Sequence, residues 1–345
     1  MKRRTFLKAA GAGVATAGFP VISAAQTPVI LKFATFQPST SYTWRVLLKP
    51  WMDKVERESH GRIKFEAYPA MQIGGTASQL YDYARDGLAD VVWTLPGYSA
   101  GRFPSVEAFE LPFMMNNAAA TSRALWEFSR VHSQDEFKET QVLALHVHGP
   151  GALHMANTVV SSPAELKSKK VRGPTRQVTK LLKSIGATPV GMLLPQISDA
   201  LSKGTIDGCA LNWEVVPAVK VQELTKHHTE FAPNRPALYT TTFGMVMNKA
   251  RYEALPPDLR KVLDANSGAD TSALFGKLVQ DGDANGRQLA VDRGNTIKTL
   301  SEAQTDAFIN ASKSVASEWV DEITKRGRNG AQLLTAAREL IAKHA

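Results

Sequence analysis

Short apolar segments alternate with amphipathic ones along most of the chain, and this alternation constrains the fold more than any other feature of the sequence. Near the start, the pattern predicts strands at 29–36, 63–68 and 90–94 and helices at 42–59 and 77–86. A second unit repeats the order, with strands at 171–174, 189–192 and 206–211 and helices at 179–185 and 197–203. Such alternation is typical of α/β folds.

The length of the chain favours two domains, because about 320 residues beyond an N-terminal export segment exceed what one hydrophobic core commonly supports. Gly149-Pro150-Gly151 follows a predicted strand at 141–148 and marks a boundary between them. The strand-like segment 239–248 is expected to return to the first unit, and the chain from Pro257 onward is predicted to be helical. We therefore expect one lobe at 26–149 plus about 237–278, and a second at 150–236 plus about 279–345 that includes the C-terminal helices.

Residues 1–25 have the layout of a signal peptide. Basic residues at 2–4 precede an apolar, small-residue stretch at 9–22, and Ser23-Ala24-Ala25 resembles a cleavage site. The stretch is shorter than the ~20 apolar residues of a membrane-spanning helix. Arg3-Arg4-Thr5-Phe6-Leu7-Lys8 resembles the twin-arginine export motif, with an ordinary secretory signal as the alternative. Both predict a mature protein outside the cytoplasm, in the periplasm.

Composition and charge exclude several classes of protein. Hydrophobic residues make up 43% of the chain and charged residues 21%, as in soluble globular proteins, and no segment after the signal is apolar and long enough to span a bilayer. Loss of the signal lowers the net charge from +9 to +5, because four basic residues and no acid leave. No basic run is interleaved with aromatic residues, so we expect no nucleic-acid partner, and a mild positive field suits small anions.

Cysteine and histidine placement argues against redox and metal chemistry. Cys209 is the only cysteine, so no intramolecular disulfide is possible, and its apolar surroundings indicate a core residue. His146, His148 and His154 lack an accompanying acidic cluster, so no metal is expected. The sequence has no G-x-S-x-G, no C-x-x-C and no strand-linked G-x-G-x-x-G. We expect a binding protein without a cofactor, and an exported cofactor-loaded oxidoreductase is the alternative from another class.

Several short motifs cover most of the mature chain in a fixed order, at 33–36, 69–75, 86–91, 166–174, 186–190, 201–208, 247–249 and 255–259. In that order they resemble the DctP-type solute-binding proteins of tripartite ATP-independent periplasmic (TRAP) transporters. The resemblance implies two α/β lobes joined by a hinge, a small organic acid bound between them, and delivery to a TRAP membrane permease. A binding protein of an ATP-driven importer, or one that feeds a sensor kinase, remains open.

The resemblance also implies a site for the ligand's carboxylate. Arg172 occupies the position of the family's carboxylate-binding arginine, and a planar guanidinium can give two parallel hydrogen bonds while staying charged. Asn212 matches the family's site asparagine and follows a predicted strand, where ligands bind in open α/β sheets. Arg176 is close enough in sequence to assist Arg172, or else to be solvated.

Two tryptophans and one leucine are candidates for the ligand's apolar part. Trp93 ends a strand of the first lobe and Trp213 follows Asn212, so an aromatic side chain from each lobe could enclose a ring. Core packing of both tryptophans is the competing interpretation. Leu194 stands where relatives often have a phenylalanine, which leaves room for bulk.

A missing arginine bears on the ligand's charge. Many relatives have a second arginine just before the residue that matches Asn157, and this sequence does not. His154 could replace part of its role, although histidine is mostly neutral at pH 7. We therefore predict a monocarboxylate with an apolar or aromatic body, and a C4-dicarboxylate or a sugar acid is the alternative.

Overall fold

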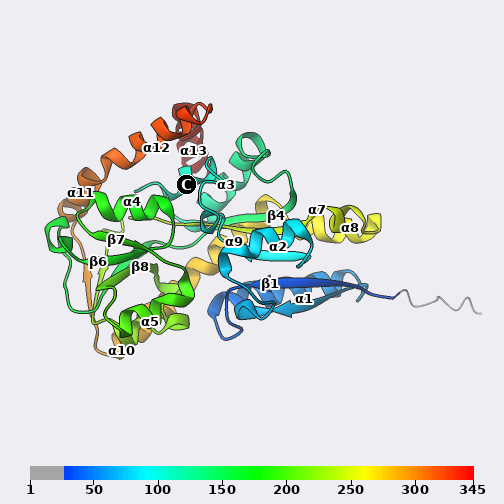
Figure 1. The fold of residues 1–345 in the computed structure, drawn as a ribbon, viewed down its shortest axis with the longest axis horizontal. Helices are drawn as coiled ribbons and strands as arrows, with labels where there is room; N and C mark the ends of the chain where they lie inside the picture. Colours follow the sequence, from blue (N-terminus) through cyan, green and yellow to red (C-terminus); the bar gives the residue numbers. More distant parts are fainter. Residues whose placement is uncertain (1–26) are drawn as a thin grey trace, which may run out of the picture.

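The computed structural model describes residues 27–345, which form two α/β lobes, each built on its own sheet (Figure 1). The predicted export signal at 1–25 lies outside the described residues. Helices cover the sheets and make up the C-terminal part of the chain. The prediction of a two-lobed α/β fold with a helical C-terminus is confirmed.

The first sheet has five strands in the order β2-β1-β3-β10-β4. They are β1 (Val29–Thr35), β2 (Ile63–Tyr68), β3 (Val91–Thr94), β4 (Thr140–Val147) and β10 (Thr242–Asn248). β1 runs parallel to β2 and β3, whereas β10 is antiparallel to both β3 and β4. A strand from the second half of the chain therefore lies inside the first lobe.

Six helices accompany the first sheet: α1 (Lys49–Glu58), α2 (Leu80–Asp86), α3 (Ala118–His132), α7 (Lys249–Glu253), α8 (Pro257–Ala265) and α9 (Ala269–Asp281). Helix α1 packs on β2, α2 on β3 and β10, and both α3 and α9 on β4. The crossing of α3 and α9 depends on Gly276, because a Cβ there would lie 2.2 Å from the Ser122 hydroxyl. Small residues thus allow the two helices to share one face of the sheet.

The second sheet has six strands in the order β11-β9-β5-β8-β6-β7. They are β5 (Gly151–Met155), β6 (Lys170–Gly173), β7 (Thr188–Gly191), β8 (Gly208–Asn212), β9 (His227–Glu230) and β11 (Thr296–Thr299). β8 is buried along its whole length, and a Cβ at Gly208 would lie 2.4 Å from the Met155 sulfur.

Cys209 is fully buried in β8, and burial raises the pKa of its thiol to about 12. It is a core residue, as predicted.

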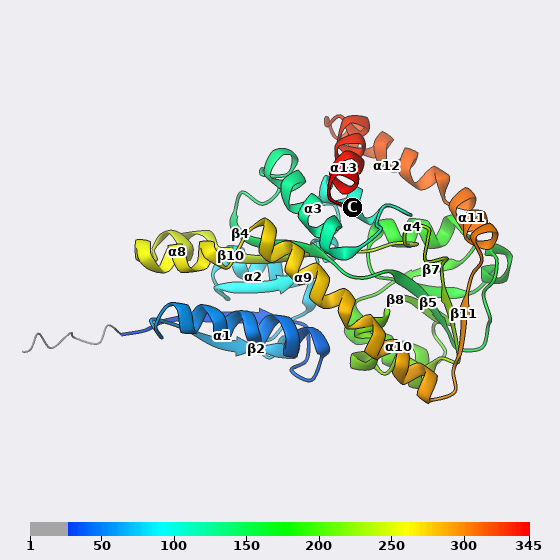
Figure 2. The same ribbon diagram turned by 180° about the vertical axis from the view of Figure 1, so that it is seen from behind.

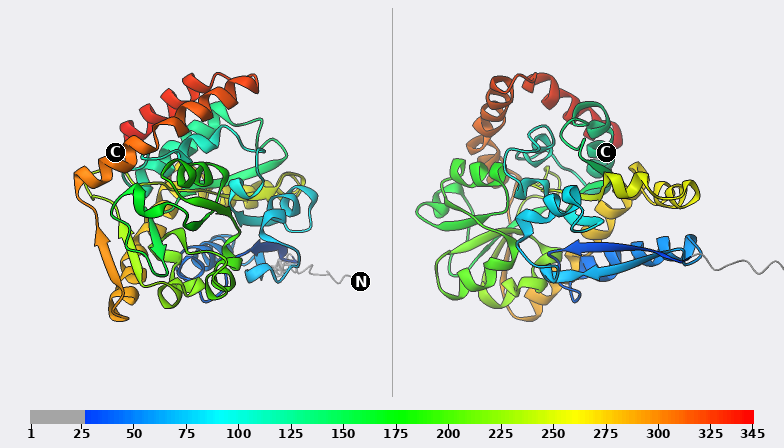
Figure 3. Two further views of the ribbon diagram at one scale, coloured as in Figure 1. Left: turned by 60° about the vertical axis from the view of Figure 1, so that its left-hand side comes forward. Right: turned by 45° about the vertical axis from the view of Figure 1, so that its right-hand side comes forward.

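The remaining helices are α4 (Arg176–Ser184), α5 (Ile197–Ser202), α6 (Val221–Leu224), α10 (Asp283–Asp292), α11 (Glu302–Ala311), α12 (Lys313–Lys325) and α13 (Gly330–His344). Figure 3 shows the last two crossing one end of the molecule. Helix α12 contacts α4 of the second lobe, whereas α13 packs on α3 of the first. The C-terminal helices therefore join the lobes, instead of belonging to the second lobe alone as the expected boundaries had it.

Three segments of the chain connect the lobes. Residues 148–150 link β4 to β5, residues 231–241 link β9 to β10, and Gly282 links α9 to α10. Figure 2 shows α9 and α10 following one another across both lobes. A Cβ at Gly282 would lie 2.5 Å from the Tyr42 ring, so only glycine permits this close crossing.

Candidate functional site

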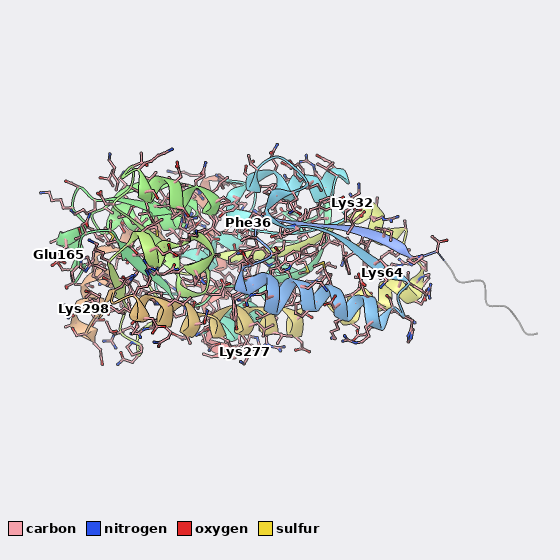
Figure 4. All side chains as sticks on the ribbon, turned by 90° about the horizontal axis from the view of Figure 1, so that it is seen from below. Lys32, Phe36, Lys64, Glu165, Lys277 and Lys298 are labelled. Carbon is pink, nitrogen blue, oxygen red and sulfur yellow. The ribbon has the colours of Figure 1, made fainter. Side chains whose placement is uncertain are left out.

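A cavity lies between the lobes, beside the carboxyl ends of strands from both sheets. Figure 4 places Phe36 where the lobes meet, while the labelled lysines lie on the outside. The wall combines aromatic, aliphatic and polar side chains, namely Phe36, Gln37, Thr43, Trp93, Leu95, Tyr98, His148, Arg172, Pro174, Leu194, Leu211, Asn212, Glu214, Val215, Tyr239, Thr241, Phe243 and Val279. Four of the seven predicted site residues, Trp93, Arg172, Leu194 and Asn212, are among them.

Arg172 lies on β6 with 1% of its surface exposed. Its Nε donates to the Met192 carbonyl at 2.9 Å and its Nη1 to the Ala210 carbonyl at 3.2 Å, which leaves Nη2 outside both bonds. Among residues 27–345, no carboxylate lies within 4.0 Å of this guanidinium. A buried cation without a counter-ion is costly, so this site favours an anion in the cavity.

Asn212 is the last residue of β8 and has 4% of its surface exposed. Its side-chain nitrogen Nδ2 is buried and has no hydrogen-bond partner among the described residues. A buried donor without an acceptor loses the hydrogen bonds that water would give it. The nearby carboxyls of Glu214 and Asp283 are close enough for the Asn212 side chain to lower their pKa values, although neither makes a well-aligned hydrogen bond with it. Asn212 therefore brings a donor to the wall that Arg172 also lines.

Glu214 brings an acidic group to the same wall. Its Oε1 accepts hydrogen bonds from the Thr43 backbone nitrogen at 3.0 Å and the Thr43 hydroxyl at 2.7 Å, so the contact joins the two lobes. Burial raises the pKa of the Glu214 carboxyl. Asp283 accepts from the Glu214 backbone nitrogen at 2.7 Å, and burial raises the pKa of Asp283 to about 8. Low-dielectric surroundings thus favour the neutral forms of both acids.

An aromatic stack forms the first-lobe side of the cavity. The rings of Trp93 and Phe243 lie 4.6 Å apart and nearly parallel, and Phe36 lies 5.4 Å from Trp93. The Trp93 nitrogen donates to His146 at 2.9 Å. Burial lowers the pKa of His146 to about 3, which keeps its ring neutral and able to accept this bond. The indole is therefore fixed, with its polar atom satisfied away from the cavity.

His148 is satisfied by backbone groups. Its Nε2 accepts from the Thr241 nitrogen at 3.1 Å, so its Nδ1 carries the proton and donates to the Gly149 carbonyl at 2.5 Å. Burial lowers the pKa of His148 to about 4. This histidine presents a neutral ring to the cavity and leaves Arg172 as the one cation among the lining residues.

Trp213 does not line this cavity. Neighbouring residues at a strand end point to opposite faces, so Asn212 faces the cavity and Trp213 points away from it. The indole borders a second cavity near the lobe connections, and its nitrogen donates to Glu230 at 2.8 Å. The predicted pair of tryptophans therefore does not enclose the interlobe cavity.

His154 is also outside the cavity, in a chain of hydrogen bonds that supports β8. Asn295 donates to His228 Nε2 at 3.0 Å, the two histidine Nδ1 atoms lie 2.7 Å apart, and His154 Nε2 lies 3.0 Å from the Leu211 carbonyl. Burial lowers the pKa of His154 to about 4 and that of His228 to about 3. One set of neutral tautomers satisfies the chain, with His228 donating to His154 and His154 donating to Leu211. The ring positions the strand rather than the ligand.

Arg176 lies at the start of α4 and is neutralised by acids. Its Nε is 3.2 Å from Glu107 Oε1, and Nη1 pairs with Glu322, which also pairs with Lys180. Glu107 belongs to the first lobe, so the arginine joins the lobes instead of facing the cavity. Because both acids already occupy its donors, Arg176 has little capacity left for a ligand.

Sequence reasoning missed several wall residues. Phe36 and His148 directly follow β1 and β4, so the strand-end argument used for Trp93 and Asn212 could have found them. Tyr98 and Tyr239 lie in connecting segments without a periodic pattern. The Tyr98 hydroxyl accepts from the Leu194 nitrogen at 3.2 Å, and only the folded chain brings the two together.

The part of the chain from residue 27 onward contains no group of three or more His, Cys, Asp or Glu side chains able to hold a metal ion. Nor does it contain a helix with the length and apolar character needed to cross a membrane. The cavity itself offers one arginine, an amide, a carboxyl group and an aromatic wall.

Comparison with known proteins identifies the family. Residues 33–322 match the model of bacterial extracellular solute-binding protein family 7 (DctP). A TRAP solute-binding protein from Rhodoferax ferrireducens, solved with copurified benzoate, is 58% identical and aligns over 92% of this chain and 98% of its own, with a TM-score of 0.91.

Two further solved structures are similar. A marine metagenome TRAP solute-binding protein specific for aromatic acids, solved with 3-hydroxybenzoate, is 45% identical over 92% of this chain and 99% of its own, with a TM-score of 0.90. A Bordetella bronchiseptica TRAP protein with bound (R)- and (S)-mandelate is 25% identical over the same shares, with a TM-score of 0.83. This chain therefore belongs to extracellular solute-binding protein family 7, the DctP-type periplasmic receptors of TRAP transporters, and not to a family of enzymes.

Proposed function

We propose that this protein captures aromatic monocarboxylate anions in the interlobe cavity and delivers them to a TRAP permease. The observation that carries the proposal is Arg172, a buried guanidinium without a carboxylate partner among the described residues, placed beside an aromatic wall. A carboxylate paired with it would accept two parallel hydrogen bonds in the geometry that arginine favours. The Asn212 nitrogen would supply a further donor.

The wall favours one negative charge on the ligand. Arg172 is the one cation that lines the cavity, and His148 is neutral because burial lowers its pKa to about 4. A second carboxylate would have no cationic partner among the lining residues. Since an unpaired buried charge costs several kcal/mol, dicarboxylates should bind poorly.

The rest of the wall suits a ring. Trp93, Phe243 and Phe36 present aromatic surface, and burial of apolar area contributes roughly 25 cal/mol per Å² removed from water. The three solved relatives were captured with benzoate, 3-hydroxybenzoate and mandelate, each an aromatic monocarboxylate. That agreement supports the same ligand class for this chain.

Capture requires the lobes to open and close. The contacts of Thr43 with Glu214 and of Tyr98 with Leu194 both span the lobes and enclose the cavity. A ligand that touches both lobes stabilises the closed form, so small-angle scattering should report a smaller radius of gyration with benzoate than without it. Transfer to a TRAP permease, and export by the twin-arginine route through residues 3–8, complete the proposal.

The test is isothermal titration calorimetry of the purified protein with benzoate, 3-hydroxybenzoate, mandelate, succinate and malate. The aromatic acids should bind at least about 100-fold more tightly than the two dicarboxylates, a difference of about 2.7 kcal/mol. Tighter binding of succinate or malate would refute the ligand class. Delivery is tested separately, by benzoate uptake into vesicles that contain the cognate permease, with and without the binding protein.

A further inference from the structure

A groove borders the ligand cavity at the mouth between the lobes. Its walls come from segments 36–38 and 70–77 of the first lobe and 193–198 and 218–219 of the second. Phe36 and Leu194 line both the groove and the cavity. These two side chains therefore form the partition between the cavity and the groove.

The two partition residues differ in the contacts that their side chains make. Phe36 is 3% exposed, with its ring 5.4 Å from that of Trp93 and 5.6 Å from that of Tyr98. Leu194 is 6% exposed, and its backbone nitrogen is tied to the Tyr98 hydroxyl while its side chain makes apolar contacts only. Shortening Leu194 removes part of the partition and leaves the aromatic stack and the backbone contact in place.

The groove beyond Leu194 is suited to an apolar tail. Its other walls include Pro38, Met71, Ala77, Ala218 and Val219. None of the groove residues is charged. A hydrocarbon chain that passed the partition would exchange water for apolar contacts, at about 0.8 kcal/mol for each methylene, or roughly fourfold in affinity.

We propose that Leu194 is the specificity-determining residue that limits the length of the ligand. It closes the cavity against the groove, so that aromatic acids with a compact body fit and those with an extended chain do not. The proposal rests on the proposed function, because it takes the carboxylate to be held at Arg172 and Asn212.

The test compares benzoate, phenylacetate, 3-phenylpropanoate and 4-phenylbutanoate by calorimetry. In the wild type, Kd should rise along the series, by at least about tenfold from first to last. Leu194→Ala should lower the ratio of the 4-phenylbutanoate Kd to the benzoate Kd by at least about tenfold, since two or more methylenes gain access to the groove. Benzoate itself should lose only a few-fold in affinity, with the thermal midpoint confirming a folded variant.

Leu211→Ala is the matched control, because Leu211 lines the cavity but not the groove. It enlarges the same cavity by the same atoms and should leave the ratio of the two dissociation constants within about threefold of wild type. A similar shift in both variants would mean that cavity volume, and not the partition, sets the limit. Wild-type protein that binds 4-phenylbutanoate as tightly as benzoate would also overturn the proposal, whereas failure of every aromatic acid to bind would refute the proposed function instead.

Discussion

Arg172 and Arg176 are four residues apart in the sequence and lie in opposite electrostatic surroundings. Arg172 lies near the end of β6 at the interlobe cavity, where two backbone carbonyls hold it and no acid pairs with it among the described residues. Arg176 begins α4, where Glu107 and Glu322 neutralise it. The first arginine has charge available for a ligand, whereas the second has already used its charge to join parts of the protein.

The comparison teaches that the partners of a buried charge, and not its residue type, indicate its role. Both arginines are close to the site in sequence, and both were candidates on that basis. The ion pairs of Arg176 indicate a structural role. Arg172 has no counter-ion, which destabilises the folded protein, and an anionic ligand would remove that penalty. Four changes would break or sharpen this contrast.

The largest effect is expected from Arg172→Ala. Removing the only cationic partner of a buried carboxylate costs on the order of 3–5 kcal/mol, which corresponds to a loss in benzoate affinity of about 100-fold or more. Arg172→Lys keeps the charge but not the planar fork, so its benzoate affinity should lie between that of Arg172→Ala and that of wild type. Calorimetry measures both, and Arg172→Ala binding within about threefold of wild type would show that the anion is held elsewhere.

The second-largest loss of benzoate affinity is expected from Asn212→Ala. A hydrogen bond to a charged group contributes about 1.5–3 kcal/mol, so the benzoate Kd should rise by about 10- to 100-fold. Asn212→Asp should be worse than Asn212→Ala, because it adds an acid where the ligand's carboxylate lies, beside Glu214. Equal affinities for the two variants would argue that the Asn212 side chain does not face the ligand's charge.

Arg176→Ala should change stability more than binding. Its ion pairs are partly exposed, so solvent screening limits their contribution, and we expect a loss of about 1–2 kcal/mol in the free energy of unfolding. Benzoate affinity should change by less than about fivefold. Lys180→Ala, which removes a cation that pairs with Glu322 alone, is the control and should cost less. Loss of binding comparable to that of Arg172→Ala would abolish the contrast between the two arginines.

The smallest effect on binding, and a distinct one on stability, is expected from Asp283→Asn. Burial raises the pKa of Asp283 to about 8, so the folded protein keeps a proton that the unfolded chain, with a pKa of about 3.9, releases earlier. The contribution of Asp283 to stability should therefore fall as the pH rises from about 4 to 8.

His146, His148, His154 and His228, whose pKa values burial lowers, act in the opposite sense below about pH 6.5 in both proteins. The difference between the variant and wild type therefore isolates Asp283, and the variant should gain stability relative to wild type as the pH rises. Glu110 and Glu136, whose pKa values burial raises to about 7, preserve part of the slope. Urea unfolding at pH 5, 6.5 and 8 measures how the free energy of unfolding depends on pH. An equal dependence in the variant and wild type would contradict the raised pKa of Asp283.

Among the described residues, the sequence predicted eight of the eleven strands and missed β5, β9 and β11. β5 is fully buried, but it directly follows the Gly-Pro-Gly segment that was interpreted as a boundary. β3 and β8 are apolar and fully buried, so their composition reveals them. β9 consists of His-His-Thr-Glu, and β11 lies in a region predicted to be helical. These two strands pair in parallel with each other at one side of the second sheet, and that pairing depends on contacts between distant segments rather than on local pattern.

The candidate site divides in the same way. Arg172 and Asn212 could be placed from the order of family motifs, and Trp93 from its position at the end of a strand. Sequence proximity misled for Trp213 and Arg176, because the direction of a side chain changes from one residue to the next at a strand end and from strand to helix. The binding roles of the wall residues stay predictions until ligand titrations are done.

The two carbonyl bonds of Arg172 also affect the entropy of binding. A free arginine side chain loses rotamer freedom when it grips a ligand, at about 0.5–1.5 kcal/mol. Here the Met192 and Ala210 carbonyls hold the guanidinium by Nε and Nη1, so folding itself restricts that freedom. The arriving anion meets a preorganised partner, and the free energy of pairing goes into affinity instead of into ordering the side chain.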